Sequence, residues 1–254
     1  MNGLYIDQVK LTRPLPANSY LSRLSAVRHL IRQGGLSFSK PVTFLVGENG
    51  TGKSTLLEAI AIAAGFNPEG GTRNFTFSTR VTHSELYRHL TIVRHAHPKD
   101  GFFLRAESFY NLASNIDEMD AEPSRGNRVI DSYGGRSLHA QSHGESFLAL
   151  IENRFGGSGL YLLDEPEAAL SPSRLMTLLV RIHDLVREQS QFIIATHSPI
   201  LMAYPGAAVY ELTESGIRPV DYRETGHYQL TRRFLENPER MLRYLLGESE
   251  QTER

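Results

Sequence analysis

The 254-residue sequence contains no cysteine, so neither a disulfide nor a cysteine-based zinc site is possible, and this absence fits a reducing compartment. No apolar segment approaches the ~20 residues that span a bilayer, and no basic segment followed by an apolar run opens the chain. We therefore expect a cytoplasmic protein with no membrane segment of its own. The net charge of −1 provides no overall attraction to nucleic acid or anionic lipid, whereas 40% apolar residues can build a core.

Short apolar segments alternate with helical patterns along the chain, which favours an α/β fold with a mainly parallel central sheet flanked by helices. The expected strands are Val42–Val46, 101–106, Leu160–Leu163 and Gln191–Ala195, followed by a hairpin of 208–212 and 217–222. The expected helices run from Lys53 to about Ala64, from Ser171 onwards and from Asn237 onwards. Residues 111–137 are polar and rich in turn-forming residues, and we expect them to leave the core as a mobile excursion.

The segment GENGTGKS, residues 47–54, follows an apolar strand and opens a helix, which is the context of a Walker A phosphate-binding loop. Glycines let backbone N–H groups turn towards a polyphosphate, and the helix N-terminus adds partial positive charge. Lys53 would reach the β and γ oxygens, and the Ser54 hydroxyl would bind Mg²⁺. The expected ATP-binding residues of this loop are Gly47, Asn49, Gly50, Thr51, Gly52, Lys53, Ser54 and Thr55.

A second acidic motif, YLLDE, ends another apolar strand at residues 161–165. Asp164, at the carboxyl end of that strand, is suited to hold the Mg²⁺ shell, and Glu165 is placed to accept a proton from an attacking water. The less specific interpretation is a strand that ends in a solvated acidic turn, and the Walker A loop upstream makes this interpretation the weaker one.

Four motifs along the chain follow one another as in the ABC-type ATPases. The sequence resembles in particular the single-domain bacterial AAA-family ATPases that are related to the SMC and recombination-repair branch. Besides Walker A and Walker B, QSHGES at 141–146 is similar to the ABC signature, and ATHSP places His197 at the position of the switch histidine. The resemblance implies a P-loop NTPase fold in one domain over residues 1–254. Its core would be about 1–106 and 158–254, with a smaller helical lobe of about 107–157 that carries the signature.

The resemblance also implies how the signature works. Ser142, Gly144 and Glu145 would open a helix and contact the γ-phosphate of ATP bound to a second copy, so that ATP joins two subunits head to tail. His197 would contact the γ-phosphate and the attacking water. The implied activity is Mg²⁺-dependent ATP binding and hydrolysis, with ATP-driven homodimerisation as a switch on a partner protein or nucleic acid.

The sequence departs from the family at the glutamine that usually senses Mg²⁺ and water, since no glutamine occurs between Lys53 and Gln141. Glu107 is the expected substitute and a metal-site candidate, with Ser108 as the alternative. The signature begins with Gln141 where an apolar residue is usual. The segment that corresponds to the family's D-loop, residues 168–171, ends in Ser171 where an acid is usual.

Four residues are candidates for the contact to the adenine base: Tyr20, Arg13, Arg23 and Arg28. A basic segment over 73–105 suggests nucleic-acid binding, with Arg73, Arg80, Arg88, Arg94 and Lys99 as the candidate residues. A solvated surface, or a set of arginines that faces nucleotide phosphates, explains the segment more simply. Two other functions compete with the switch. One is the cytosolic ATP-binding subunit of a membrane ABC transporter, which the missing glutamine disfavours. The other is a nucleotide-gated scaffold without hydrolysis, which the presence of Asp164, Glu165 and His197 disfavours.

Overall fold

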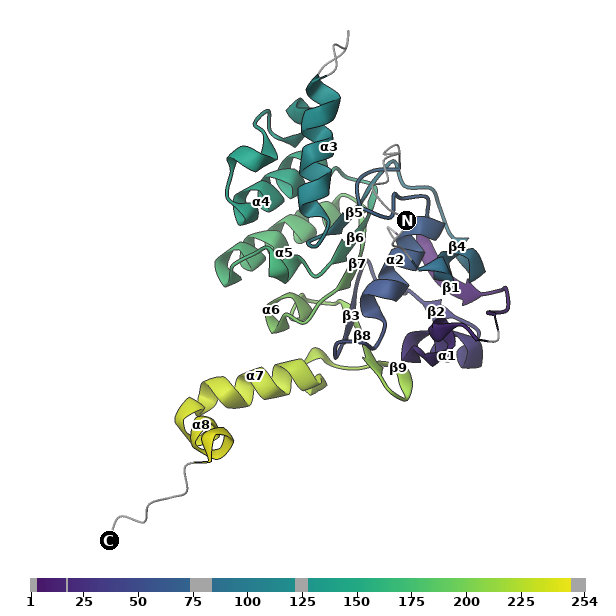
Figure 1. The fold of residues 1–254 in the computed structure, drawn as a ribbon, viewed down its shortest axis with the longest axis vertical. Coiled ribbons are helices and arrows are strands. Elements are labelled where there is room, and N and C mark those ends of the chain that lie inside the picture. The colour runs from purple at the N-terminus through teal and green to yellow at the C-terminus, as the bar shows by residue number, and fades with distance from the viewer. Residues whose placement is uncertain (1–3, 17, 74–83, 122–127, 248–254) are drawn as a thin grey trace.

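The computed structural model describes residues 4–16, 18–73, 84–121 and 128–247. These residues build a six-stranded sheet, a smaller three-stranded sheet and helices on both faces of the larger sheet (Figure 1). The architecture is the α/β P-loop NTPase fold that the sequence predicts.

The larger sheet carries the site. Its strands lie in the order β5 (Asp100–Arg105), β6 (Gly159–Asp164), β7 (Gln191–Ala195), β3 (Val42–Gly47), β8 (Ala208–Thr213) and β9 (Gly216–Pro219). The first five run parallel, and β9 pairs antiparallel with β8 through a tight turn. In the smaller antiparallel sheet the order is β2 (Leu36–Ser37), β1 (Ile6–Leu11) and β4 (Leu90–Arg94).

Eight α-helices occur in the described residues. They are α1 (Ser25–Gln33), α2 (Lys53–Ala63), α3 (Phe109–Ala121), α4 (His143–Arg154), α5 (Pro172–Arg187), α6 (Pro199–Met202), α7 (Gly226–Glu236) and α8 (Pro238–Leu246). Figure 1 shows α2, α1 and the smaller sheet on one side of the larger sheet, and α3 to α6 on the other.

The central strands are apolar throughout because both faces of the sheet are covered, as in other parallel sheets. Phe44 and Leu163 pack into the core beneath α3 to α6, whereas their neighbours Leu45 and Leu162 pack into the core around α2. Since successive side chains of a strand point to opposite faces, one sheet supports two separate cores. All of these side chains are fully buried, which holds the carboxyl ends of the strands in fixed positions.

The predicted strands and helices are confirmed to within one or two residues, except that the second strand of the hairpin, expected over 217–222, ends at Pro219. The prediction of a mobile excursion over 111–137 is wrong for its first part. Residues 109–121 form α3, which buries Phe109, Leu112, Ala113 and Ile116. These residues recur at helical spacing; polar residues lie between them, and the acidic residues Asp117, Glu118 and Asp120 follow Ile116. Val129–Tyr133 forms a 3-10 turn, and residues 122–127 lie outside the described part of the chain.

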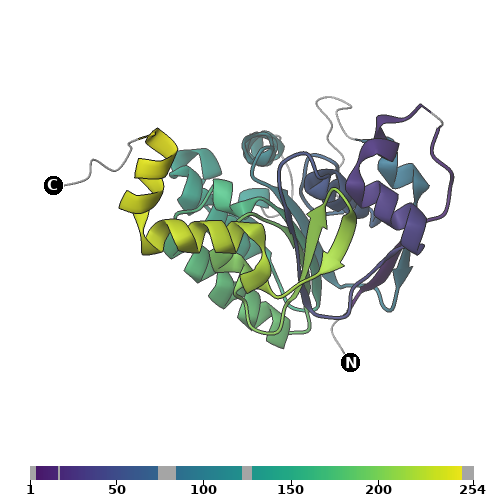
Figure 2. The ribbon, with the colours of Figure 1, turned by 90° about the horizontal axis from the view of Figure 1, so that it is seen from below.

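The last two helices leave the sheet at β9 and project away from the domain (Figures 1 and 2). Neither helix has a buried residue, and Leu235, Tyr244 and Leu246 are among their exposed apolar side chains. Within the described ranges, no helix combines the length and the apolar character needed to cross a membrane.

Candidate nucleotide-binding and catalytic site

The site lies where the parallel strands end. The strand register places Asp164 of β6 opposite Arg105 of β5 and opposite Ala195 of β7. The Walker A loop follows β3, the neighbour of β7. The loops that follow β3, β5, β6 and β7 therefore converge at one edge of the sheet, as expected for ligand sites of this fold class.

The Walker A loop folds closely around its lysine. Gly47 has φ 142°, and a Cβ atom there would collide with the backbone oxygen of Leu212 on β8, so the position requires glycine. Lys53 is 4% exposed, and its Nζ donates to the backbone oxygens of Gly47 at 2.7 Å and Glu48 at 3.2 Å. Burial lowers the pKa of Lys53, while Glu165 and Asp164 act in the opposite direction. An anionic phosphate would favour the charged amine further.

Asp164 has the character of a metal ligand. Its side chain is 8% exposed, and its Oδ1 atom is buried without a hydrogen-bond partner. Burial raises the pKa of Asp164 to about 6, which Arg105 and a hydrogen bond with Ser54 partly offset. A hydroxyl and a carboxylate with a free oxygen form the donor set that Mg²⁺ uses together with substrate phosphates. No cluster of three or more His, Cys, Asp and Glu side chains suited to a metal occurs in the described residues.

A cavity of about 240 Å³ opens beside this pair, lined by Ser54, Ala106, Glu107, His143, Asp164, Glu165 and Ala168. Glu107 therefore borders the same space as Ser54 and Asp164, and its side chain is 86% exposed and held by Arg105 Nη2 at 3.3 Å. The alternative, Ser108, donates through Oγ to the backbone oxygen of Glu69 at 2.5 Å. Of the two candidates for the position of the missing glutamine, Glu107 is the one that borders this cavity.

Glu165 sits at the junction between the strand and the D-loop. Its backbone is left-handed, with φ 49°, a conformation that costs a non-glycine residue about 1 kcal/mol. Its N–H donates to Ala195 O at 2.9 Å, which ties the loop to β7. His197 Nε2 lies 3.3 Å from Glu165 Oε1, so the expected base and the expected switch histidine are already in contact. The 40% exposure of the Glu165 side chain leaves room for a water beside it.

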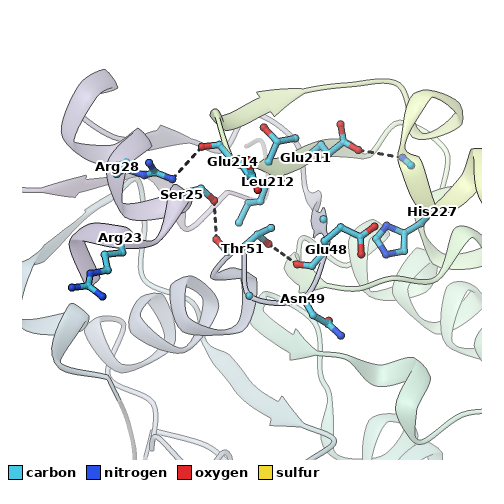
Figure 3. A pocket seen from close by; sticks show the side chains of 14 residues that line it. Arg23, Ser25, Arg28, Glu48, Asn49, Thr51, Glu211, Leu212, Glu214 and His227 are labelled. Carbon is cyan, nitrogen blue, oxygen red and sulfur yellow. Dashed lines mark hydrogen bonds between the residues drawn. The ribbon is translucent and has the colours of Figure 1, made fainter. Parts of the chain in front are cut away.

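A second and larger cavity, about 690 Å³, lies on the other side of the Walker A loop. Figure 3 shows Glu48 and His227 side by side at one end and Arg23 and Arg28 at the other. Of the four candidates for the base contact, Arg23 and Arg28 line this cavity. Arg13 Nη1 instead donates to Arg88 O at 3.3 Å, and Tyr20 is not among the lining residues.

The signature motif opens α4 with a capping box. Ser142 is the N-cap, and Glu145 Oε2 accepts from the Ser142 backbone N–H at 3.0 Å and from its hydroxyl at 2.6 Å. Gly144 is buried against the D-loop, where a Cβ atom would lie 3.0 Å from Ala169 O. Ser142 and Glu145 are exposed, and none of these three residues lines the larger cavity. This geometry fits two roles of the signature motif: a cap of α4, and a surface that contacts a second molecule.

The basic segment is largely committed to contacts within the chain. Arg88 pairs with Glu85 at 3.0 Å, Arg94 donates to Ala64 O at 3.1 Å, and the Arg73 guanidinium lies over the Phe66 ring. Lys99 is exposed, and Arg80 lies outside the described residues. These contacts within the chain favour a structural role of the basic segment over a role in binding nucleic acid.

Sequence reasoning missed three residues that complete the site. Arg105 pairs with Glu58 at 2.7 Å and reaches towards Asp164 at 3.5 Å. Glu167 accepts from Thr196 Oγ1 at 2.8 Å and from the His197 backbone N–H. His227 lies in the first turn of α7, 30 residues after His197. The Thr-Gly pair before an amphipathic segment is a sequence signal for the start of this helix. No sequence signal shows that the first turn of the helix lies beside the Walker A loop.

Comparisons with known proteins agree with this geometry. Residues 23–100 match the family described as "AAA domain", and residues 138–203 match "AAA domain, putative AbiEii toxin, Type IV TA system". An uncharacterized ABC transporter ATP-binding protein of Haemophilus influenzae is 28% identical over 176 residues, which are 64% of this chain and 66% of the relative.

A solved structure has the same fold. It is titled "An inward-facing conformation of a putative metal-chelate type ABC transporter", and it aligns with a TM-score of 0.50 at 15% identity over 91% of this chain and 88% of that one. The chain therefore has the fold of ABC ATP-binding cassettes, and parts of its sequence are similar to AAA domains and to an ABC transporter ATP-binding protein.

Proposed function

We propose that the protein binds ATP with Mg²⁺ between its Walker A loop and Asp164, hydrolyses it, and uses the cycle to join and release a second copy of itself. The observation that carries the ATP site is the buried Asp164 oxygen without a partner, next to Ser54 and one residue before Glu165. A buried carboxylate without sufficient partners is costly, and a divalent cation bridging to phosphates would offset that cost.

Each residue of the site has a separate role in the proposed reaction. Ser54 Oγ and Asp164 would hold Mg²⁺, which supplies charge stabilisation to the phosphates. Lys53 binds the β- and γ-phosphate oxygens and neutralises charge as the terminal bond breaks. Glu165 accepts the proton of the water whose oxygen attacks the γ-phosphorus, while the bridging oxygen leaves with ADP. His197 Nε2 orients Glu165 in the nucleotide-free protein and is free to donate to the γ-phosphate once ATP is bound.

The proposal for the dimer rests on the exposed signature. Ser142 and Glu145 face solvent at the start of α4, a 12-residue helix whose N-terminus favours anions. Ser142 borders neither the smaller nor the larger cavity of its own chain, so its hydroxyl and the N–H groups of the first turn of α4 are suited to bind the γ-phosphate held by a second copy, in place of the Glu145 carboxylate that the Ser142 hydroxyl now contacts. Two-fold symmetry would then build two equivalent pockets, and hydrolysis would remove the charge that joins them.

The test uses Glu165→Gln, which keeps the shape of the side chain and removes its basicity. We expect the variant to bind ATP·Mg²⁺ without turnover and to accumulate as a dimer in light scattering, while the wild type returns to monomer as ATP is consumed. Glu118→Gln, an exposed change on α3, is the matched control and should behave as wild type. A monomer at saturating ATP·Mg²⁺ would contradict the dimer, and continued phosphate release would contradict the role of Glu165.

A second candidate function is the ATP-binding subunit of a membrane transporter, and the relative from Haemophilus influenzae carries that name. Glu107 at the position of the usual glutamine weighs against it, because that loop normally couples to the membrane partner. Co-purification of the Glu165→Gln variant with an integral membrane protein would favour the transporter. Recovery of a protein or nucleic-acid partner from the soluble fraction would favour the switch. A low-salt DNA-binding assay checks the nucleic-acid version, and no effect of DNA on mobility or ATP turnover would exclude it.

A further inference from the structure

His227 stands at the start of α7, between the larger cavity and the switch histidine. It lines the cavity next to Gly47 and Glu48, and its Nε2 atom lies 2.7 Å from His197 Nδ1. The ring centroids are 4.7 Å apart. Neither histidine in this pair is an isolated surface residue, since both are half-buried. The contact joins the C-terminal helices to the residues that surround the reacting phosphate.

Two hydrogen bonds hold the start of α7 in place. Thr225 is fully buried and caps the helix, accepting from Tyr228 N at 3.4 Å. The N–H of Gly226 donates to Glu211 Oε1 at 3.2 Å, and Glu211 Oε2 is in turn held by Arg218 Nη2 at 2.6 Å. Figure 3 shows the bond from Glu211 to the backbone just before His227. The position of the His227 ring is therefore set by the β8–β9 hairpin rather than by a free helix end.

The partners of His197 define where its proton resides. Its Nε2 atom faces the Glu165 carboxylate at 3.3 Å, and a carboxylate only accepts, so Nε2 carries the hydrogen. In the neutral ring, Nδ1 is then the acceptor and requires a donor. His227 Nε2 lies 2.7 Å from Nδ1 and can be that donor, and we assign the hydrogen of this contact to His227 on the ground that His197 Nε2 faces a carboxylate. Burial, and then the proximity of His197, lower the pKa of His227, which agrees with a neutral ring at this position.

We propose that His227 is a positioning residue that donates to His197 Nδ1 and thereby keeps His197 in the tautomer whose Nε2–H points at Glu165 and at the γ-phosphate of bound ATP. The inference rests on the proposed function, because it assumes that His197 assists hydrolysis. It adds a residue outside the sequence motifs and makes α7 part of the catalytic arrangement. A histidine that donates to its partner's ring fixes both orientation and tautomer, as outer partners do for metal-bound histidines.

The test compares His227→Leu, which removes the donor, with His227→Gln, whose side-chain amide N–H can reach the same atom. We expect the kcat for ATP hydrolysis to fall about tenfold in His227→Leu, the loss of one hydrogen bond, and to be largely restored in His227→Gln. KM and the directly titrated ATP affinity should change less than twofold. His97→Leu, an exposed histidine on the other side of the fold, is the matched control and should leave kcat unchanged.

A spectroscopic readout separates positioning from general damage. In ¹⁵N-histidine-labelled protein, the two-bond ¹H–¹⁵N spectrum should show His197 as the Nε2–H tautomer in wild type and in His227→Gln. In His227→Leu the Nδ1–H form should appear.

Three outcomes would overturn the inference: wild-type kcat in His227→Leu, loss confined to ATP affinity, or equal loss in both variants with an unchanged His197 spectrum. A parallel His197→Ala variant shows which claim has failed. If it hydrolyses ATP normally, the proposed role of His197 is wrong. If it is inactive while His227→Leu is normal, only the inference is wrong.

Discussion

Replacing Asp164 with asparagine should stabilise the nucleotide-free protein while destroying its activity. The carboxylate is buried, one of its oxygens has no partner, and its pKa is raised to about 6 from an ordinary value of 3.8. That difference corresponds to about 3 kcal/mol by which the folded state disfavours the ionised form. Asparagine has nearly the same shape and no charge to bury, and Arg105 keeps its shorter pair with Glu58 at 2.7 Å.

The sign of the pH dependence follows from the raised pKa. Above pH 6 the wild type bears the full cost of burying the charge, so Asp164→Asn should exceed it in free energy of unfolding by about 3 kcal/mol. As the pH falls from 6 towards 3.8 the wild-type carboxyl binds a proton in the folded state, and the difference should shrink towards zero. Urea unfolding with a metal chelator present, at several pH values between 4.5 and 7.5, measures this difference.

Added Mg²⁺ and nucleotide should stabilise the wild type and leave Asp164→Asn little changed, because a ligand stabilises only the state that binds it. Glu118→Gln, on the surface of α3, controls for loss of a negative charge and should change stability by less than about 0.5 kcal/mol. Equal free energies of unfolding for the wild type and Asp164→Asn at pH 7.5, or a difference between them that does not vary with pH, would refute the interpretation of Asp164 as a buried metal ligand whose charge is costly.

Two further predictions concern the same edge of the sheet. Lys53→Ala should abolish ATP binding in a direct titration while leaving the circular dichroism spectrum unchanged, and an unchanged affinity would refute the phosphate assignment. The Mg²⁺ concentration needed for half-maximal ATPase activity should rise as the pH falls through about 6, because Asp164 must lose its proton to bind the ion; a flat Mg²⁺ requirement between pH 5 and 8 would place the ion elsewhere.

The parts of the fold that the sequence predicts are those with strong local signals. The strands around Phe44, Leu162 and Ile193 are apolar on both faces, and the loop at Gly47 carries its glycines where the backbone needs them, so both are visible without a structure. The helix at Phe109–Ala121 was missed because its buried face of four residues is diluted by acids and amides in the sequence. Composition alone favours a loop there, whereas spacing favours a helix.

The sequence predicts those site residues that lie at or just after the carboxyl ends of parallel strands. Asp164 ends one buried strand, Glu165 follows it directly, and His197 lies two residues after the next strand along the chain; the parallel register brings them together. Arg105 ends a strand as well, but its role depends on a partner, Glu58, that lies on another element. His227 depends on the path of the chain after β9, which only the three-dimensional fold provides.

The central claim is that the Walker A loop of one copy meets the signature of another when ATP is bound. Because the chain has no cysteine, Asn49→Cys and His143→Cys, both at exposed positions, can be made separately in the Glu165→Gln background and mixed. On a non-reducing gel, the mixture should form a disulfide-linked dimer with ATP·Mg²⁺ and not with ADP. No cross-link with ATP, or the same cross-link without nucleotide, would contradict the account.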